Sequence, residues 1–127
     1  IIGRLVGSEM CIRDSVNKIG SYTDKKVEEL INKHPSIGDW RNTGMLGCIE
    51  LVKNRKNKDP LAPFNANSKE MEDMNKVIRK LRDEGMFTYT KWNYIFIAPP
   101  LTSSEEDIDE GIDIISKALK VADEFCY

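Results

Sequence analysis

The stretch YIFIAPPLTSSEEDID at Tyr94–Asp109 is the segment that says most about the fold of this chain. Its bulky apolar start, Tyr94–Ala98, predicts a strand. Pro99–Pro100 ends that strand, because neither proline can donate a ladder hydrogen bond. Thr102 and Glu105 have the spacing of a capping box, which predicts that a helix with an acidic first turn follows at once.

The segments upstream of this stretch predict a helix and then a strand. Residues 16–33 place apolar side chains on one helical face, and His34–Pro35 ends that helix because a residue before proline avoids helical angles. Residues 36–39 are expected to form a loop. Met45–Val52 is almost entirely apolar, which is typical of a strand buried on both faces.

A second helix and a hairpin are predicted between that strand and Pro99. A polar loop covers residues 53–67, after which Ser68 is expected to cap a helix that Gly85 stops. Met86–Tyr89 and Tyr94–Ala98 are expected to pair as a hairpin. The apolar stripe of the second helix comprises Met71, Met74, Val77, Ile78 and Leu81, and that of the last helix comprises Ile108, Ile112, Ile115, Leu119 and Ala122. The predicted fold is α+β: a three-stranded, mainly antiparallel sheet with helices packed on one face.

Composition excludes several classes of partner. The chain has 127 residues and a formal net charge of −2, so neither nucleic acid nor an anionic membrane is expected as a partner. The three cysteines are too few and too scattered for a disulfide framework or a metal site, which favours reduced thiols in the cytoplasm. His34, the single histidine, is expected to be a helix-end residue rather than a ligand.

The first fifteen residues differ from the rest of the chain. They show no clear helical or strand period, and Gly3 and Gly7 interrupt them. The string from Val6 to Ser15 resembles translated sequencing-adapter DNA. We therefore interpret residues 1–15 as a non-native segment and residues 16–127 as the domain, a fragment of a longer protein.

The residues alone do not assemble an active site. The sequence contains no nucleophile–base pair, no glycine-rich phosphate loop with the required spacing and no clustered metal ligands. The carboxylates at 105–109 stand at a helix start, where they complement the helix dipole.

Four segments, taken together and in order, resemble the class III aminotransferases, which are fold type I enzymes that use pyridoxal phosphate (PLP). They are His34–Arg41 (HPSIGDWR), Thr43–Lys53 (TGMLGCIELVK), Leu81–Met86 (LRDEGM) and the opening stretch continued to Ile115. Two further stretches, Lys58–Asn65 and Glu84–Asn93, look most like the members that act on taurine or β-alanine with pyruvate.

The resemblance implies the C-terminal small domain of a homodimeric transaminase. Such an enzyme moves an amino group from an ω-amino acid or aminosulfonate donor to pyruvate or another 2-oxo acid. Its PLP lysine and the aspartate at the cofactor's ring nitrogen belong to the upstream large domain, so no catalytic or cofactor-binding residue is expected here. Thr88-x-x-Lys91 has the local spacing of a PLP lysine but no accompanying aspartate or phosphate cup, and the fragment is predicted to be inactive.

The resemblance also implies that the small domain covers the cleft and binds the acidic end of the substrate. Some members place an arginine in the hairpin before the Pro-Pro pair. Here the nearest cation is Lys91, and Trp92 could wall the entrance; the alternatives are a solvent-facing turn residue and core packing. Phe96 stands where other relatives carry an arginine, which argues against an ornithine-like mode. Arg41 is expected to pair with a carboxylate.

Two other readings stay open on the sequence. The same superfamily includes aminomutases, decarboxylases and racemases, and the residues that select the reaction lie upstream. The third reading is a non-catalytic α+β module that binds a ligand or mediates oligomerisation.

Overall fold

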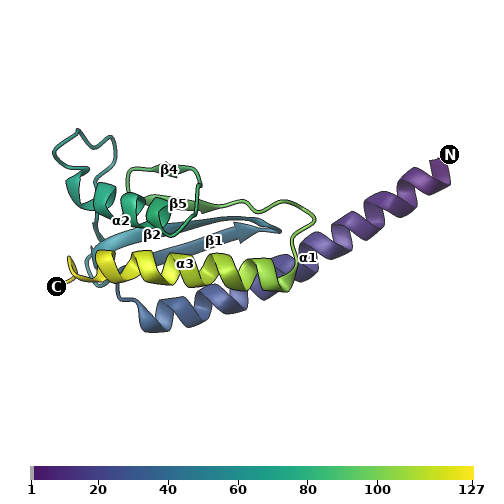
Figure 1. The fold of residues 1–127 in the computed structure, drawn as a ribbon, viewed down its shortest axis with the longest axis horizontal. Coiled ribbons are helices and arrows are strands. Elements are labelled where there is room, and N and C mark those ends of the chain that lie inside the picture. Colours follow the sequence, from purple (N-terminus) through teal and green to yellow (C-terminus); the bar gives the residue numbers. More distant parts are fainter. Residues whose placement is uncertain (1) are drawn as a thin grey trace.

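The computed structural model describes residues 2–127, with side chains from residue 11 onward. Three helices pack against a sheet, and the N-terminal part of the longest of them projects from the body (Figure 1). The helices are α1 (Ile2–Lys33), α2 (Glu72–Asp83) and α3 (Glu105–Asp123). The strands are β1 (Ile37–Thr43), β2 (Leu46–Asn54), β3 (Asp59–Pro60), β4 (Thr90–Lys91) and β5 (Tyr94–Ile97).

The sheet is antiparallel throughout, in the order β1-β2-β5-β4, and β3 pairs with the far end of β2. It has five strands rather than the expected three. One core joins Leu30 of α1, Val77 of α2 and Ile115 of α3 to Ile49 and Ile95 of the sheet. The three helices therefore cover one face, and the α+β prediction is confirmed.

The predicted loop at residues 36–39 is wrong, because β1 begins at Ile37. Ile37 pairs with Leu51 and is 1% exposed, so its burial against β2 outweighs the polar residues that follow it. Gly44 turns the chain between β1 and β2 with a φ of +59°, a left-handed angle that suits glycine. The prediction that Met45–Val52 is buried on both faces is wrong too. This strand is buried on one face only, because its alternate residues lie on the uncovered side of the sheet.

The strand predicted at Met86–Tyr89 is wrong as well. That segment has no strand, and the hairpin partner of β5 is the two-residue β4, which starts at Thr90. Residues 86–89 still lie beside β5 through isolated hydrogen bonds. In one of them the Phe96 N–H donates to the Tyr89 carbonyl at 3.0 Å.

Both predicted helix caps are displaced along the chain. Near α2, the Asn67 carboxamide rather than the Ser68 hydroxyl accepts from the backbone, taking the N–H groups of residues 69 and 70. At α3 the capping box is Ser104 with Asp107 rather than Thr102 with Glu105: Ser104 Oγ accepts from the Asp107 N–H at 3.2 Å, and Asp107 Oδ2 accepts from the Ser104 N–H at 2.9 Å. The apolar stripes of both helices and the left-handed stop at Gly85 (φ +96°) are confirmed.

α1 starts far earlier than the predicted residue 16. No proline interrupts residues 2–33, so helical hydrogen bonding can continue through them. Residues 11–15 are exposed, and Figure 1 shows this end of α1 extending away from the sheet. Within the described residues, no helix is both long and apolar enough to cross a membrane.

α1 approaches the β1–β2 turn at backbone distance. A Cβ added at Gly20 would lie 2.4 Å from the Gly44 carbonyl oxygen, so only glycine fits at that position of α1. Tyr22 and Lys26 of the same helix contact Asp109 of α3 at 2.6 and 3.4 Å.

A buried polar network joins the end of α1 to α3. His34 directly follows α1 and is 4% exposed; its Nδ1 lies 2.6 Å from Asp123 Oδ2 and its Nε2 lies 2.8 Å from Ser116 Oγ. Asp123 Oδ1 also accepts from the hydroxyl and the N–H of Ser36. Arg55 donates to the carbonyls of Ile31 and His34, which closes the helix end. The network accounts for His34 as a structural residue, as predicted.

Candidate functional site

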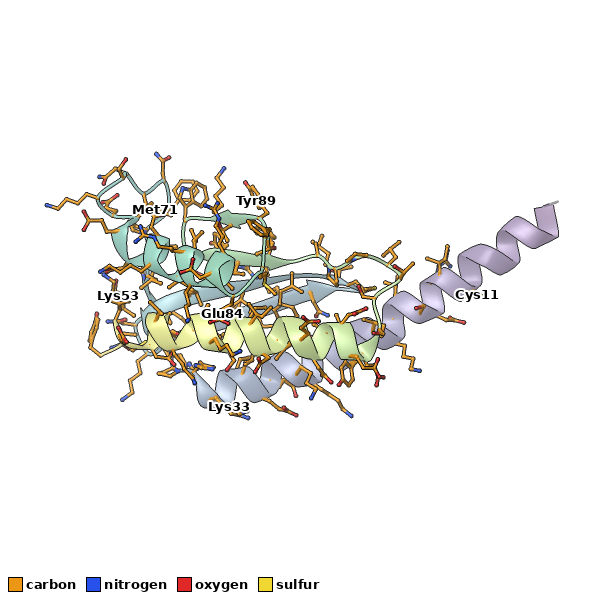
Figure 2. The ribbon with its side chains drawn as sticks, in the orientation of Figure 1. Cys11, Lys33, Lys53, Met71, Glu84 and Tyr89 are labelled. Atoms are coloured by element: carbon orange, nitrogen blue, oxygen red, sulfur yellow. The ribbon has the colours of Figure 1, made fainter. Side chains whose placement is uncertain are left out.

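The uncovered face of the sheet is built from two rows of side chains. In an antiparallel sheet, residues directly opposite one another point to the same face. The register therefore aligns Asp39, Glu50, Tyr94 and Lys91 in one row, and Arg41, Cys48 and Phe96 in the next. Figure 2 shows Tyr89, which neighbours Phe96, on the opposite side of the molecule from Lys33 at the end of α1.

The β1 side of this face carries charges that satisfy one another. Arg41 Nε lies 3.2 Å from Asp39 Oδ2, and its Nη2 lies 3.4 Å from Glu50 Oε2. The prediction that Arg41 pairs with a carboxylate is confirmed. Beside it, partial burial raises the pKa of the Cys48 thiol, which disfavours the reactive thiolate form.

The β4–β5 hairpin presents the predicted pair, Lys91 and Trp92, which we call the hairpin tip. The loop has only two residues, Trp92 and Asn93, because Lys91 pairs with Tyr94. Trp92 has a φ of +49°, a strained left-handed angle for an aromatic residue. The Lys91 Nζ lies 4.8 Å from the centroid of the Trp92 ring, within range of a cation–π interaction. Among the described side chains, Lys91 has no carboxylate within ion-pair distance.

Phe64 joins the hairpin tip from a distant segment. Its ring centroid lies 4.4 Å from that of Trp92, although 80% of Phe64 is exposed. The ring centroid of Tyr94 lies 6.4 Å from that of Trp92. Phe64 was not predicted as a site residue from the sequence. Its signal is a lone aromatic residue in a polar loop, and only tertiary structure shows what it contacts.

A second aromatic pair extends the uncovered face toward Pro99. Tyr89 and Phe96 lie 5.2 Å apart between ring centroids, and the Thr88 hydroxyl donates to the Phe96 carbonyl. Phe96 is half-buried, so the side chain at this position contributes apolar surface and no charge.

A groove of about 480 Å³ lies beside the Pro-Pro pair and is distinct from the hairpin tip. Its walls are residues 86–88, residues 96–100 and the first half of α3, with Thr23 of α1. The lining contains no lysine or arginine, and its one carboxylate, Asp107, already caps α3. The groove therefore offers a phosphate no cationic side chain. In the described part of the chain, no three His, Cys, Asp or Glu side chains gather as metal ligands.

Comparison with known proteins identifies one family that the chain matches over most of its length. The family model described as aminotransferase class-III matches residues 6–119. The chain is 31% identical to the taurine–pyruvate aminotransferase of Bilophila wadsworthia, covering 87% of this chain and 24% of that protein. It is 29% identical to the leucine/methionine racemase of Thermococcus litoralis, covering 84% and 22%.

The fold of the chain is also similar to part of a solved aminotransferase structure. The taurine:2-oxoglutarate aminotransferase from Bifidobacterium kashiwanohense, in complex with PLP and glutamate, superposes with a TM-score of 0.82 and 26% identity, covering 91% of this chain and 25% of that one. The chain thus spans about a quarter of the length of the proteins that it matches.

Proposed function

Since the chain belongs to the class-III aminotransferase family, we propose that residues 16–127 are the C-terminal small domain of a PLP-dependent transaminase. The observation that carries the proposal is the family match over nearly the whole chain, together with an uncovered sheet face that ends in a cationic, aromatic tip. We place PLP in the upstream part of the intact enzyme, because the groove in this chain has no lysine that could hold the cofactor and no cationic side chain for its phosphate.

The upstream part of the enzyme is proposed to cover the open sheet face. Leu46 and Tyr89, whose segments form this face, are 58% and 62% exposed, and Phe87, which borders the groove, is 81% exposed. A domain that is complete by itself seldom leaves so many large apolar groups in water. The isolated chain should bind a hydrophobic dye strongly, and the intact enzyme weakly; equal binding per molecule would contradict the proposal.

The proposed substrates are an ω-amino acid or aminosulfonate donor and pyruvate or another 2-oxo acid. The similarity to two taurine aminotransferases supports this class. So does the exposed side chain of Lys91, which can attract a carboxylate or sulfonate. Lys91 would act as a point charge without the bidentate fork of arginine. Trp92 would restrict the space beside it.

The decisive experiment uses the enzyme completed with its upstream coding sequence. Taurine and β-alanine should each yield alanine from pyruvate. Lys91→Ala should raise KM for the anionic substrate about tenfold and leave kcat within about threefold, because the lost attraction acts on binding. Lys91→Arg, which keeps the charge, should stay close to the parent. An unchanged KM in Lys91→Ala would remove Lys91 from the site.

The isolated chain is proposed to be inactive. Purified chain mixed with PLP should leave the absorbance spectrum of the free cofactor unchanged, and no alanine should form from pyruvate. A new absorbance band that Lys91→Ala abolishes would show instead that Lys91 binds the cofactor.

A second candidate reaction is racemisation, which the similarity to the leucine/methionine racemase favours. The intact enzyme would then invert L-leucine or L-methionine without forming alanine from pyruvate. Chiral chromatography of the amino acid, run beside the alanine assay, separates the two reactions.

Residues 1–15 are proposed to be non-native because of their resemblance to adapter sequence. Amplification of the genomic locus tests this directly: the native reading frame should diverge upstream of residue 16. The intact enzyme is also proposed to be a cytoplasmic homodimer, which light scattering and cell fractionation would check.

A further inference from the structure

We propose that Asn93 is a positioning residue that holds Trp92 and Phe64 in contact and so presents Lys91 to the substrate. The inference rests on the proposed function of the hairpin tip and adds a residue that does not itself touch substrate. It is carried by the backbone junction beneath the tip.

At this junction, β2 changes its pairing partner. Glu50 is the last β2 residue paired with β5, opposite Tyr94, and Val52 is the first paired with β3, opposite Pro60. Leu51 lies between the two pairings, and both its backbone groups point to the side where β5 gives way to β3.

Asn93 fills this position with both its backbone and its side chain. The Leu51 N–H donates to the Asn93 carbonyl at 2.8 Å, and the Asn93 side-chain amide donates to the Leu51 carbonyl at 2.8 Å. The same Leu51 carbonyl accepts from the Leu61 N–H at 3.1 Å. One carbonyl therefore joins the β4–β5 loop to the segment that follows β3.

Each of these two segments adjoins an aromatic residue, the partly buried Trp92 in one and the exposed Phe64 in the other. Trp92 precedes Asn93 and keeps its left-handed angle, while Leu61 and Ala62, which are 1% and 0% exposed, lead to Phe64. The rings of Phe64 and Trp92 then meet at 4.4 Å. Because neither aromatic residue is buried, the buried junction beneath them determines where their rings lie.

The chemistry of the junction requires an amide. Asn93 is 3% exposed, and its NH₂ group faces a carbonyl oxygen. An aspartate of the same shape would place a carboxylate oxygen, which can only accept, against that carbonyl, and the Leu61 N–H would be the one donor left to it. Asn93→Asp therefore removes the hydrogen bond to the β4–β5 loop and adds a charge, while it preserves the volume.

The first experiment follows the tip in the 127-residue chain. Trp40→Phe leaves Trp92 as the single tryptophan, and acrylamide quenching then reports its exposure. Asn93→Asp should raise the quenching constant about twofold or more, whereas Asn75→Asp, the same change on an exposed face of α2, should leave it unaltered. Asn93→Ser serves as a milder variant. Unchanged quenching in either Asn93 variant, with a native circular dichroism spectrum, overturns the proposal.

A measurement on the unmodified chain makes the test independent of variants that fail to fold. The side-chain amide protons of Asn93 should exchange with solvent at least about tenfold more slowly than those of Asn75, because only the former are buried and bonded. Equal exchange rates would overturn the proposal.

The second experiment separates this inference from the proposed function. In the intact enzyme, Asn93→Asp should raise KM for the anionic substrate about threefold to tenfold and leave kcat within about twofold. If Lys91→Ala raises KM and Asn93→Asp does not, the positioning role fails and the proposed function stands. If Lys91→Ala has no effect, the proposed role of Lys91 in the site fails, and the quenching and exchange results still decide whether Asn93 holds the tip.

Discussion

The two faces of β2 differ in what holds their side chains. Ile49 and Leu51 are fully buried under α1, α2 and α3, whereas Cys48 and Glu50, which alternate with them along β2, stay partly exposed. The covered face is completed by residues of this chain. The uncovered face carries paired charges at one end and aromatic rings in tilted contact at the other, and no helix of the described chain covers it. The contrast predicts that substitutions should affect stability on the first face and surface properties on the second.

The largest difference is expected between neighbouring residues of β2. Ile49→Ala should lower the free energy of unfolding by about 3 kcal/mol, because it removes buried methyl groups and leaves a cavity. Cys48→Ala should lower it by less than about 0.5 kcal/mol. Urea unfolding followed by circular dichroism measures both. Equal losses would show that the two faces are packed alike.

The buried network at the end of α1 should rank next. Asp123→Ala leaves the donors of His34 and Ser36 without an acceptor, and we expect a loss of about 2–3 kcal/mol. Asp113→Ala, on the same helix, removes only an exposed pair with Lys117 and should change stability by less than about 0.5 kcal/mol. A difference in melting temperature between the two variants is the readout; coincident melting curves would rule out a structural role for the network.

Substitutions on the uncovered face should change the binding of a hydrophobic dye more than they change stability. Phe64→Ala should lower stability by less than about 1 kcal/mol, since it removes one exposed aromatic contact. It should also reduce the fluorescence of a bound hydrophobic dye. A large loss of stability with unchanged dye binding would mean that Phe64 belongs to the core.

The smallest effect should be a pH dependence at the α1–α3 contact. The hydrogen bond from the Tyr22 hydroxyl, helped by the Lys26 charge, holds the pKa of Asp109 below its ordinary value of 3.8. A lowered pKa stabilises the fold above the unfolded-state value, and this contribution is lost as the pH falls through the folded-state pKa. Asp109→Asn should therefore be less stable than the parent near about pH 6, and the difference should vanish in acid. A difference independent of pH would assign the effect to packing.

Local patterns in the sequence were sufficient for the helical core. The stripe of Met74, Val77 and Leu81 predicted the buried face of α2, because helical periodicity is a property of neighbouring residues. The cap of α3 was misplaced because Thr102 and Ser104 offer the same chemistry. Only the extended backbone at Ser104, with φ −91° and ψ 171°, selects between them.

Contacts distant in sequence could not be predicted in this way. Lys91 and Trp92 were proposed as site residues because they lie just before the Pro-Pro stretch, and their role in binding stays a prediction. Phe64 and Asn93 were missed because their roles depend on tertiary partners: the Asn93 amide bonds to a carbonyl 42 residues earlier. β1 was missed in part because its polar residues conceal a strand that pairing with β2 stabilises.

The close approach of Gly20 to Gly44 has a consequence for how this domain can vary. Any side chain at position 20 would meet the carbonyl oxygen of residue 44 at 2.4 Å, and residue 44 is itself held at a left-handed angle. The two positions therefore constrain each other, although they belong to different elements. A viable replacement at position 20 would require a simultaneous change in the turn, so divergence here should proceed by paired substitution or by a change in loop length.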